Sequence, residues 1–426
     1  MRSRRKHSSP IPKPVRVLVI AATGLAVGLA LMMANAPPPN ASSGANHDTF
    51  AQSKSPKRMA RRGRRTPVLS VGGQEAVATQ SNPVHAPLPP MECFDARLHE
   101  TTVACIDPAM RSASTIDWPF QERITRYLRS KPLMAAAYVA IEIDTGNVLA
   151  LVSHDATTNL VSDEVFQARA PAASIFKIVT SAGLIQQGLH TKSQICSHGG
   201  SSGIEIEHLR DSSKHDRCET FRDAFAHSRN SAFAKLADRF TNSKSLSHAA
   251  TSLGFNSEIP FPYPLRPSTA TIPSTRLARA RLAAGFSAVS LNPVHAALIA
   301  ATIARGGTFP LPRLTRGATD PTQIRRVLPR RSATILQQLM RATVTSGTGR
   351  RTLGRSRIPA AAKSGTLSAF RNGKRAHNTW MVGYFPVDRP RIAFASLVVN
   401  DEVWHIRAGD VAKQAMDLYA QIHPGL

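Results

Sequence analysis

The sequence of 426 residues is short of acidic and aromatic side chains. Asp and Glu together number 27 against 54 Lys and Arg, which leaves a formal net charge of +27. Such an excess favours an anionic partner: nucleic acid, a membrane surface or an acidic polymer. However, aromatic residues make up only 6%, and the chain has neither zinc-finger spacing nor an aromatic-studded RNA-binding signature. We therefore expect no nucleic-acid partner and assign the charge to attraction for anionic lipid or cell-wall polymer.

Long hydrophobic runs are scarce too, with one exception close to the N-terminus. Val17–Ala34 is apolar and uncharged, follows a cluster of Arg and Lys, and is just long enough to span a bilayer. The positive flank places the N-terminus inside the cell. Ala34-Asn35-Ala36 is also typical of a cleavage site, so removal of the segment stays open. We predict a cytoplasmic basic tail at 1–16, a single-pass signal-anchor at 17–36 in the inner (cytoplasmic) membrane, and a body in the periplasm or another extracytoplasmic space.

Cysteine is rare, with four residues in the chain: Cys93, Cys105, Cys196 and Cys218. An even count in an oxidising compartment predicts two disulfides. Sequence proximity alone pairs Cys93 with Cys105 and Cys196 with Cys218; four buried free thiols are the alternative. Four histidines lie near the second pair, namely His190, His198, His208 and His215. Their spacings are irregular for zinc, so we expect no metal site.

The composition divides the exported body into a linker and a folded domain. Residues 37–90 are rich in Pro, Ser, Ala, Asn and Arg, with too little apolar periodicity to build a core. Met91–Ser112 is a short lead-in that carries two of the cysteines. We predict a linker over 37–116 and one folded domain over 117–426, and find no internal repeat.

Hydrophobic patterns in the folded part predict strands at both ends and helices between them. The predicted strands are Ala137–Ile143, Val148–Val152, one after Lys363, Thr379–Phe385 and Ile392–Val399, with a basic loop at Arg371–His377. The predicted helices are Ile124–Arg129, Ile175–Gln187, Phe221–His227, Ser231–Phe240, Pro293–Arg305, Ser332–Thr345 and Asp410–Ile422. Strands from both ends must meet in one antiparallel sheet flanked by helices, with a mostly helical subdomain inserted. The predicted fold class is therefore α/β.

The first of three informative runs is Ser174-Ile-Phe-Lys177. On a helix, residues three apart lie on one face, so Ser174 and Lys177 are within reach of each other. A serine hydroxyl needs a base to become a good nucleophile, and a lysine in a dry pocket near other cations has a lowered pKa and can be that base. The alternative is an ordinary core helix with one exposed lysine.

The second run is Ser228-Arg-Asn230. Ser228 can relay a proton between Lys177 and a leaving amine, and the Asn230 amide can hold both Lys177 and a backbone amide of a substrate. We expect Arg229 to point elsewhere. The alternative is a helix cap, where Ser and Asn are common.

The third run is Lys363-Ser-Gly-Thr366, which follows three alanines and precedes strand-forming residues. Lys363 brings positive charge, and Ser364 and Thr366 bring hydroxyls suited to a carboxylate. Gly365 leaves space for a substrate to lie against the strand. The backbone N–H groups of Ser174 and Thr366 can form an oxyanion hole. The alternative is a turn with a flexible glycine.

Together and in this order, the three runs resemble the transpeptidase domain of the penicillin-binding proteins, which has the β-lactamase/transpeptidase-like fold. The likeness covers about Met134 to Leu418 and includes Asp144–Ala150, Ala284–Ser287 and Thr379–Pro386. The resemblance implies a peptidoglycan D,D-transpeptidase with these roles: Ser174 as acylated nucleophile, Lys177 as general base, Ser228 and Asn230 in proton transfer and positioning, and Lys363, Ser364 and Thr366 binding a carboxylate. Cys196 with Cys218 resembles a pair found in some members.

The resemblance also implies partners: a D-Ala-D-Ala stem peptide, β-lactams, the membrane, and cell-wall synthesis or divisome proteins. No cofactor is implied. Residues 37–116 are too few and too polar for a glycosyltransferase domain, and Asn292-Pro293 stands where many members have Thr-Pro. The alternatives are a D,D-carboxypeptidase, a β-lactamase of the same fold, a weakly catalytic wall or divisome protein, and an exported polymer-binding protein that uses the Lys54–Arg65 cluster. The acceptor strand and the role in elongation, division or sporulation stay open.

Overall fold

The computed structural model describes residues 113–156, 163–286, 289–317 and 325–425. The predicted tail, the predicted anchor and most of the predicted linker lie outside these residues, as do Cys93 and Cys105. None of the helices that the structure describes is long and apolar enough to cross a bilayer.

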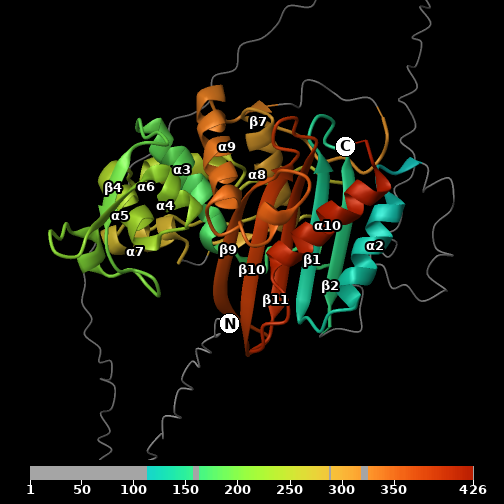
Figure 1. The fold of residues 1–426 in the computed structure, drawn as a ribbon, viewed down its shortest axis with the longest axis horizontal. Coiled ribbons are helices and arrows are strands. Elements are labelled where there is room, and N and C mark those ends of the chain that lie inside the picture. Colours follow the sequence, from blue (N-terminus) through green and yellow to red (C-terminus); the bar gives the residue numbers. More distant parts are fainter. Residues whose placement is uncertain (1–112, 157–162, 287–288, 318–324, 426) are drawn as a thin grey trace, which may run out of the picture. The chain divides into compact units, whose positions relative to one another are not determined.

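A five-stranded antiparallel sheet organises the domain (Figure 1). Its order is β2 (Val148–Asp155), β1 (Ala135–Glu142), β11 (Ile392–Asn400), β10 (Lys374–Phe385) and β9 (Ala361–Arg371). The first strand along the chain lies beside the last, since β1 pairs with β11 over its whole length. The predicted antiparallel sheet, built from both ends of the folded chain, is therefore confirmed. The arrangement leaves β9, which carries the third run, as an edge strand.

Two hydrophobic cores cover the two faces of this sheet, because side chains alternate along each strand. On one face, α2 (Trp118–Arg129) and α10 (Ala408–Ile422) pack around Tyr138 (Figure 1). On the other face, α8 (Pro293–Ala304) packs around Val139. The α8 helix is apolar on nearly all sides because it is buried between the sheet and other helices.

The region inserted between β2 and β9 is mostly helical, as predicted. Besides α8 it contains η4 (Ala173–Phe176), α3 (Lys177–Gln186), α4 (Phe221–Ala226), α5 (Asn230–Phe240), α6 (Ser243–Ser252), α7 (Arg276–Ala284) and α9 (Arg330–Thr345). Three short strand pairs join β3 (Ala170–Pro171) to β6 (Ser290–Leu291), β4 (Gln194–Ser197) to β5 (Arg217–Thr220), and β7 (Thr308–Phe309) to β8 (Arg325–Arg326). The predicted helices are all present, and most of their ends are displaced by one or two residues. The helix predicted at Ile124–Arg129 is an exception, because α2 already begins at Trp118. Helices α6 and α7 were not predicted.

The predicted basic loop at Arg371–His377 is wrong. Strands β9 and β10 continue through it as a hairpin in which Lys374 pairs with Arg371. The turn consists of Asn372 and Gly373 alone, with φ of 50° and 74°. Positive φ at both central residues is the type I′ turn that Asn-Gly favours, because its twist matches that of the flanking strands. Positive charges on exposed strand positions do not prevent this pairing.

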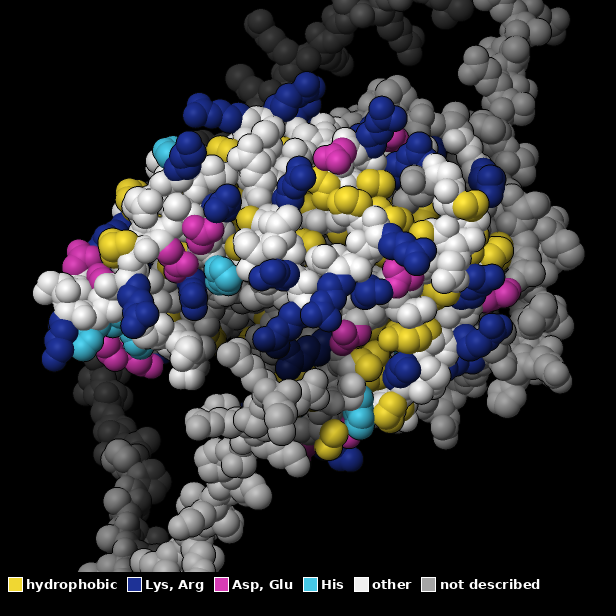
Figure 2. All heavy atoms as spheres, viewed as in Figure 1, with side chains coloured by type: hydrophobic (Ala, Val, Ile, Leu, Met, Phe, Trp, Pro, Cys, Tyr) yellow, Lys and Arg dark blue, Asp and Glu magenta, His cyan; other side chains and the backbone are white. Residues whose placement is uncertain are grey.

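Positive charge is spread over the domain rather than confined to the N-terminal segments. Lys and Arg side chains dominate over Asp and Glu on the face seen in Figure 2. An anionic polymer or an anionic small ligand would therefore be attracted to the folded domain itself.

Candidate active site

The first run forms a single 3-10 turn that leads into a helix, so the predicted helix at Ile175–Gln187 begins differently from expected. The turn is η4, and α3 starts only at Lys177. Ala173, just before Ser174, has a left-handed φ of 49°. Such a conformation is uncommon for a residue with a side chain and persists only where surrounding contacts impose it. The turn brings Lys177 Nζ to 2.8 Å from Ser174 Oγ.

Lys177 is fully buried and has three hydrogen-bond partners. Besides Ser174 Oγ, its Nζ lies 2.8 Å from Asn230 Oδ1 and 2.7 Å from the carbonyl oxygen of Ala284. These two oxygens can only accept hydrogen bonds. A neutral lysine amine has two hydrogens and one lone pair, so both hydrogens go to Asn230 and Ala284. The lone pair is then left for the hydroxyl of Ser174, which is the arrangement of a general base and its nucleophile.

The environment favours this neutral amine. Burial, followed by the nearby positive charge of Lys363, lowers the pKa of Lys177 well below its ordinary value of 10.5. Burial also lowers the pKa of Lys363 to about 7. Two lysines therefore face one small polar site, and the positive charge of Lys363 favours the neutral form of Lys177.

We predict that the lowered pKa of Lys363 makes stability depend on pH. Between about 7 and the ordinary 10.5, the unfolded chain binds a proton that the folded chain does not. The free energy of unfolding therefore rises with pH in this window, by up to about 1.4 kcal/mol per pH unit from this group. Lys363→Met should remove that contribution. In urea unfolding, the wild-type value minus the variant value should increase by about 2 kcal/mol from pH 7.5 to 9.5. An unchanged difference would mean that Lys363 titrates alike in both states.

The second run lies at the junction of two helices. Helix α4 ends at Ala226, Ser228 takes a left-handed φ of 56°, and α5 begins at Asn230. This sharp junction aims both side chains at the site. Ser228 Oγ accepts a hydrogen bond from Lys363 Nζ at 3.0 Å, and Asn230 Nδ2 donates one to the carbonyl of Ser201 at 3.2 Å. Arg229 points elsewhere, with its Nε 3.6 Å from Glu219.

The third run lies on the edge strand β9 beside η4. Lys363 is fully buried and donates to the Ser364 carbonyl at 2.8 Å as well as to Ser228. Ser364 Oγ lies 2.6 Å from Thr348 Oγ1, and Thr366 is exposed. A Cβ on Gly365 would lie 3.2 Å from Ile175 Cγ1. The missing side chain thus lets β9 approach the turn of Ser174, a role that the sequence did not indicate.

Gly285, which follows α7, is a further residue of the site. It has a left-handed φ of 93° and ends the helix. A Cβ there would lie 2.6 Å from the carbonyl oxygen of Ala173 and 3.0 Å from the nitrogen of Ser174. Its neighbour Ala284 supplies the carbonyl that holds Lys177. The end of α7 therefore fixes both the base and the backbone of the nucleophile. Gly285 lies in the Ala284–Ser287 run that resembles the family, but α7 was not predicted, so the sequence gave no indication of this contact.

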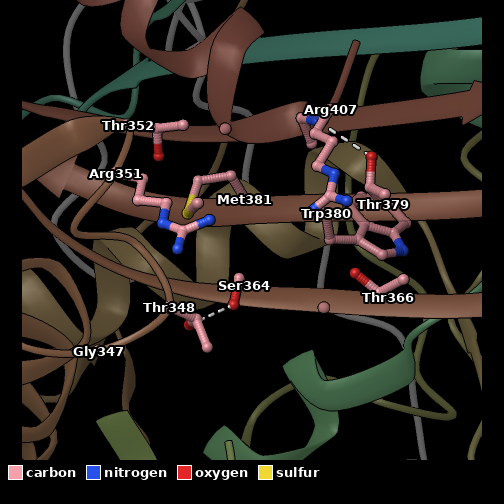
Figure 3. A pocket seen from close by; sticks show the side chains of 13 residues that line it. Gly347, Thr348, Arg351, Thr352, Ser364, Thr366, Thr379, Trp380, Met381 and Arg407 are labelled. Carbon is pink, nitrogen blue, oxygen red and sulfur yellow. Dashed lines mark hydrogen bonds between the residues drawn. The ribbon is translucent and has the colours of Figure 1, made fainter. Parts of the chain in front are cut away.

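A pocket of about 390 Å³ opens next to Ser364 and Thr366 (Figure 3). It lies over β9 and β10, and two arginines reach into it from other segments: Arg351 from the loop after α9, and Arg407 from the residue before α10. The sequence gave no reason to select either arginine, because their placement depends on loops that the sheet brings together.

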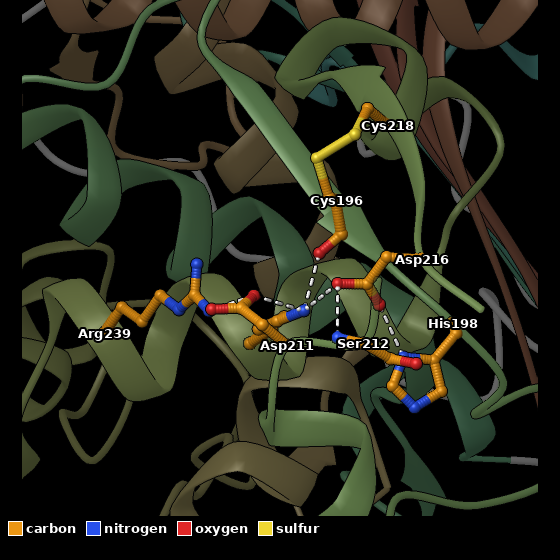
Figure 4. The surroundings of a disulfide bond; sticks show 8 residues. Cys196, His198, Asp211, Ser212, Asp216, Cys218 and Arg239 are labelled. Carbon is orange, nitrogen blue, oxygen red and sulfur yellow. Dashed lines mark hydrogen bonds and ion pairs between the residues drawn. A yellow bond between two sulfur atoms is a disulfide. The ribbon is translucent and has the colours of Figure 1, made fainter. Parts of the chain in front are cut away.

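The cysteine pair of the inserted region is joined in a disulfide between β4 and β5 (Figure 4). Beside it, buried Lys235 donates to the Cys196 carbonyl at 2.8 Å and to Asp216 at 2.7 Å. Burial alone would raise the pKa of Asp216, but the hydrogen bonds from Lys235 and His198 lower it to about 2. Among the described residues, no three His, Cys, Asp or Glu side chains are grouped to hold a metal ion. Lys235, Asp216 and His198 instead form a polar network under the hairpin.

Comparisons with known proteins agree with this geometry. A family model described as the penicillin binding protein transpeptidase domain matches residues 136–419. The chain is 28% identical over 310 residues to peptidoglycan D,D-transpeptidase PbpA of Mycobacterium tuberculosis, covering 62% of each chain. It is 27% identical over 306 residues to PbpA of Mycolicibacterium smegmatis, covering 61% of each. The chain thus spans less than two thirds of the length of these relatives.

Solved structures show the same fold. The crystal structure of PBPA from Mycobacterium tuberculosis gives a TM-score of 0.59 at 23% identity, covering 72% of this chain and 81% of that one. A peptidoglycan synthetase from Bifidobacterium adolescentis gives 0.62 at 16% identity, covering 74% and 61%. The antiparallel sheet with its flanking helices is therefore an established architecture.

Proposed function

Because this chain belongs to the family of penicillin-binding protein transpeptidase domains, we propose that it cross-links peptidoglycan stem peptides through an acyl-enzyme on Ser174. The observation that carries the proposal is the pairing of buried Lys177 with Ser174. Two obligate acceptors take the hydrogens of the neutral amine, and the lone pair is left for the nucleophile. β-Lactams would acylate the same serine. We further propose that residues 17–36 anchor the chain in the cytoplasmic membrane.

In the acylation step, Ser174 Oγ attacks the carbonyl carbon of the penultimate D-Ala while Lys177 takes its proton. The backbone N–H groups of Ser174 and Thr366 stabilise the negative oxygen that develops. The C–N bond to the terminal D-Ala then breaks, and the leaving amine needs a proton. Ser228 supplies it and is reprotonated by Lys363, to which it is hydrogen-bonded. The amine of a second stem peptide next attacks the acyl carbonyl carbon and gives a proton through Ser228 to Lys363, to which Ser228 is hydrogen-bonded. The ester bond to Ser174 breaks, Lys177 returns its proton to Ser174 Oγ, and the cross-link is complete.

The site favours a transpeptidase over a β-lactamase. Fast hydrolysis of the acyl-enzyme needs a base that is positioned to activate water. In the described residues, the hydrogen-bond partners of Lys177 and Lys363 are hydroxyls, an amide and backbone carbonyls, with no carboxylate among them. The carboxylate of buried Glu164 forms ion pairs with Arg371 and Arg169. We therefore expect slow hydrolysis of the acyl-enzyme, which leaves time for an amine acceptor to attack it.

The test uses the full chain with a D-Ala-D-Ala pentapeptide donor, with and without an acceptor amine. We expect release of D-Ala and a cross-linked product, both absent in Ser174→Ala. Release of D-Ala without any cross-linked product would make the chain a carboxypeptidase. Rapid turnover of a β-lactam without action on the peptide would make it a β-lactamase. Mass spectrometry of the products distinguishes the three outcomes.

A further inference from the structure

The pocket beside β9 combines hydroxyl groups with two guanidinium groups (Figure 3). In the hairpin register, Thr366 lies opposite Thr379, so both side chains occupy the same face of the sheet. Ser364, two residues along, shares that face. Lys363 and Gly365 face the other side, toward Ser228 and the turn of Ser174. The pocket is therefore adjacent to the reacting centre but separate from the Lys177 network.

The charges in the pocket are of one sign. Arg351 and Arg407 are both exposed, and no Asp or Glu lines the pocket. Neither arginine takes part in an ion pair within the part of the chain that the structure describes. Asp410, in the first turn of α10, accepts the backbone N–H of Arg407 and so caps the helix. The N-terminus of α10 adds further positive potential where it meets the pocket.

Arg407 packs against one aromatic ring, which is itself supported by a second ring. Its guanidinium lies 4.9 Å from the centre of the Trp404 ring. Trp404 in turn stacks on His377 of β10, with ring centres 4.8 Å apart and an angle of 21° between the planes. His377 Nδ1 lies 2.8 Å from Ser368 Oγ on β9. The stack connects Arg407 to the hairpin and limits the directions in which its side chain can point.

We infer that Arg351 and Arg407 bind the carboxylate-bearing end of the acyl donor, and that Trp404 positions Arg407 for this. The inference rests on the proposed function, because the donor reacts at Ser174. Guanidinium groups bind carboxylates by paired, charge-assisted hydrogen bonds, and the hydroxyls of Ser364 and Thr366 supply further donors. The pocket is larger than one carboxylate group, so it accepts the whole C-terminal D-amino acid. The two arginines select anionic donors over neutral ones.

Benzylpenicillin and its methyl ester test this selection, because they share the reacting ring and differ in the charge of the carboxyl group. The rate constant for acylation of the full chain is measured with both compounds for Arg407→Gln and Arg351→Gln. Arg350→Gln is the matched control, since Arg350 lies next to Arg351 in sequence and does not line the pocket. We expect each pocket variant to lower the rate with the acid by about 10- to 100-fold, as for a lost hydrogen bond to a charged group. The rate with the ester should change by less than about 2-fold, and the control should change neither.

Trp404 has a test of its own. Trp404→Ala should lower the acid-to-ester ratio of rate constants, and Trp404→Phe should restore most of it, because a phenyl ring still supports the guanidinium. A purely structural role of Trp404 would lower both rates together and leave the ratio unchanged. An unchanged ratio in the two arginine variants would overturn the inference, while adducts on Ser174 would leave the proposed function standing. No adduct in the wild-type chain with either compound would overturn both.

Discussion

Replacing Lys177 with methionine is expected to slow the acylation of Ser174 by about 10²- to 10⁴-fold, the range for loss of a general base. Methionine nearly preserves the volume of the buried side chain but has no lone pair that can take the hydroxyl proton. The free energy of unfolding at neutral pH should change by less than about 2 kcal/mol, because the lost hydrogen bonds are offset by removal of a buried amine. Stopped-flow acylation with a fluorescent penicillin and urea unfolding measure the two effects.

Lys235 provides the contrast for this variant, because it is a second fully buried lysine. Its amine is paired with Asp216 and Asp211 rather than with a hydroxyl. Lys235→Met removes the amine from Asp216, which keeps its hydrogen bonds with His198 and the Ser212 backbone N–H, and should cost about 1–3 kcal/mol of stability. Loss of stability without loss of rate in Lys177→Met would show that Lys177 is a structural lysine like Lys235, and the account of the base would be wrong.

Gly285→Ala is expected to slow acylation by about 10²-fold, although it adds only one methyl group. The new Cβ would lie 2.6 Å from the carbonyl oxygen of Ala173, so the turn that carries Ser174 must move. The same shift displaces the Ala284 carbonyl from Lys177. A misplacement of about 1 Å is enough for an effect of this size.

Gly188→Ala is the matched control for Gly285→Ala. Both glycines have φ of 93°, but a Cβ on Gly188 would meet no atom within 4 Å. Each variant should lose about 1–2 kcal/mol from the left-handed backbone alone. Only Gly285→Ala should lose acylation rate in the folded protein. Equal rates in the two variants would show that the end of α7 does not position the nucleophile.

The sheet and most helices could be predicted because periodicity and turn residues are local properties of the sequence. Tyr138 and Val139 are neighbours on β1 and belong to different hydrophobic cores, one on each face of the sheet. The hairpin turn at Asn372-Gly373 was also readable, and it was missed because the neighbouring basic residues suggested a loop. The sequence-based expectation erred there by giving exposed charge more weight than turn chemistry.

The predicted fold implied that the three runs lie close together. It did not give the hydrogen-bond partners and close contacts within the site. The pairing of Ser228 with Lys363, rather than with Lys177, depends on where β9 lies against α4. The contact of Gly285 with the nucleophile turn and the reach of Arg407 into the pocket are tertiary approaches between distant segments. No local pattern encodes such approaches, because each depends on the relative placement of two separately formed elements.

The most direct test of the central claim is intact-mass analysis of the full chain after incubation with benzylpenicillin, followed by peptide mapping of the adduct. The account predicts one covalent adduct, located on Ser174, that persists during the incubation. It predicts no adduct in Ser174→Ala and much slower formation in Lys177→Met. An adduct that survives in Ser174→Ala, or folded wild-type protein that forms none, would contradict the assignment of Ser174 as the nucleophile.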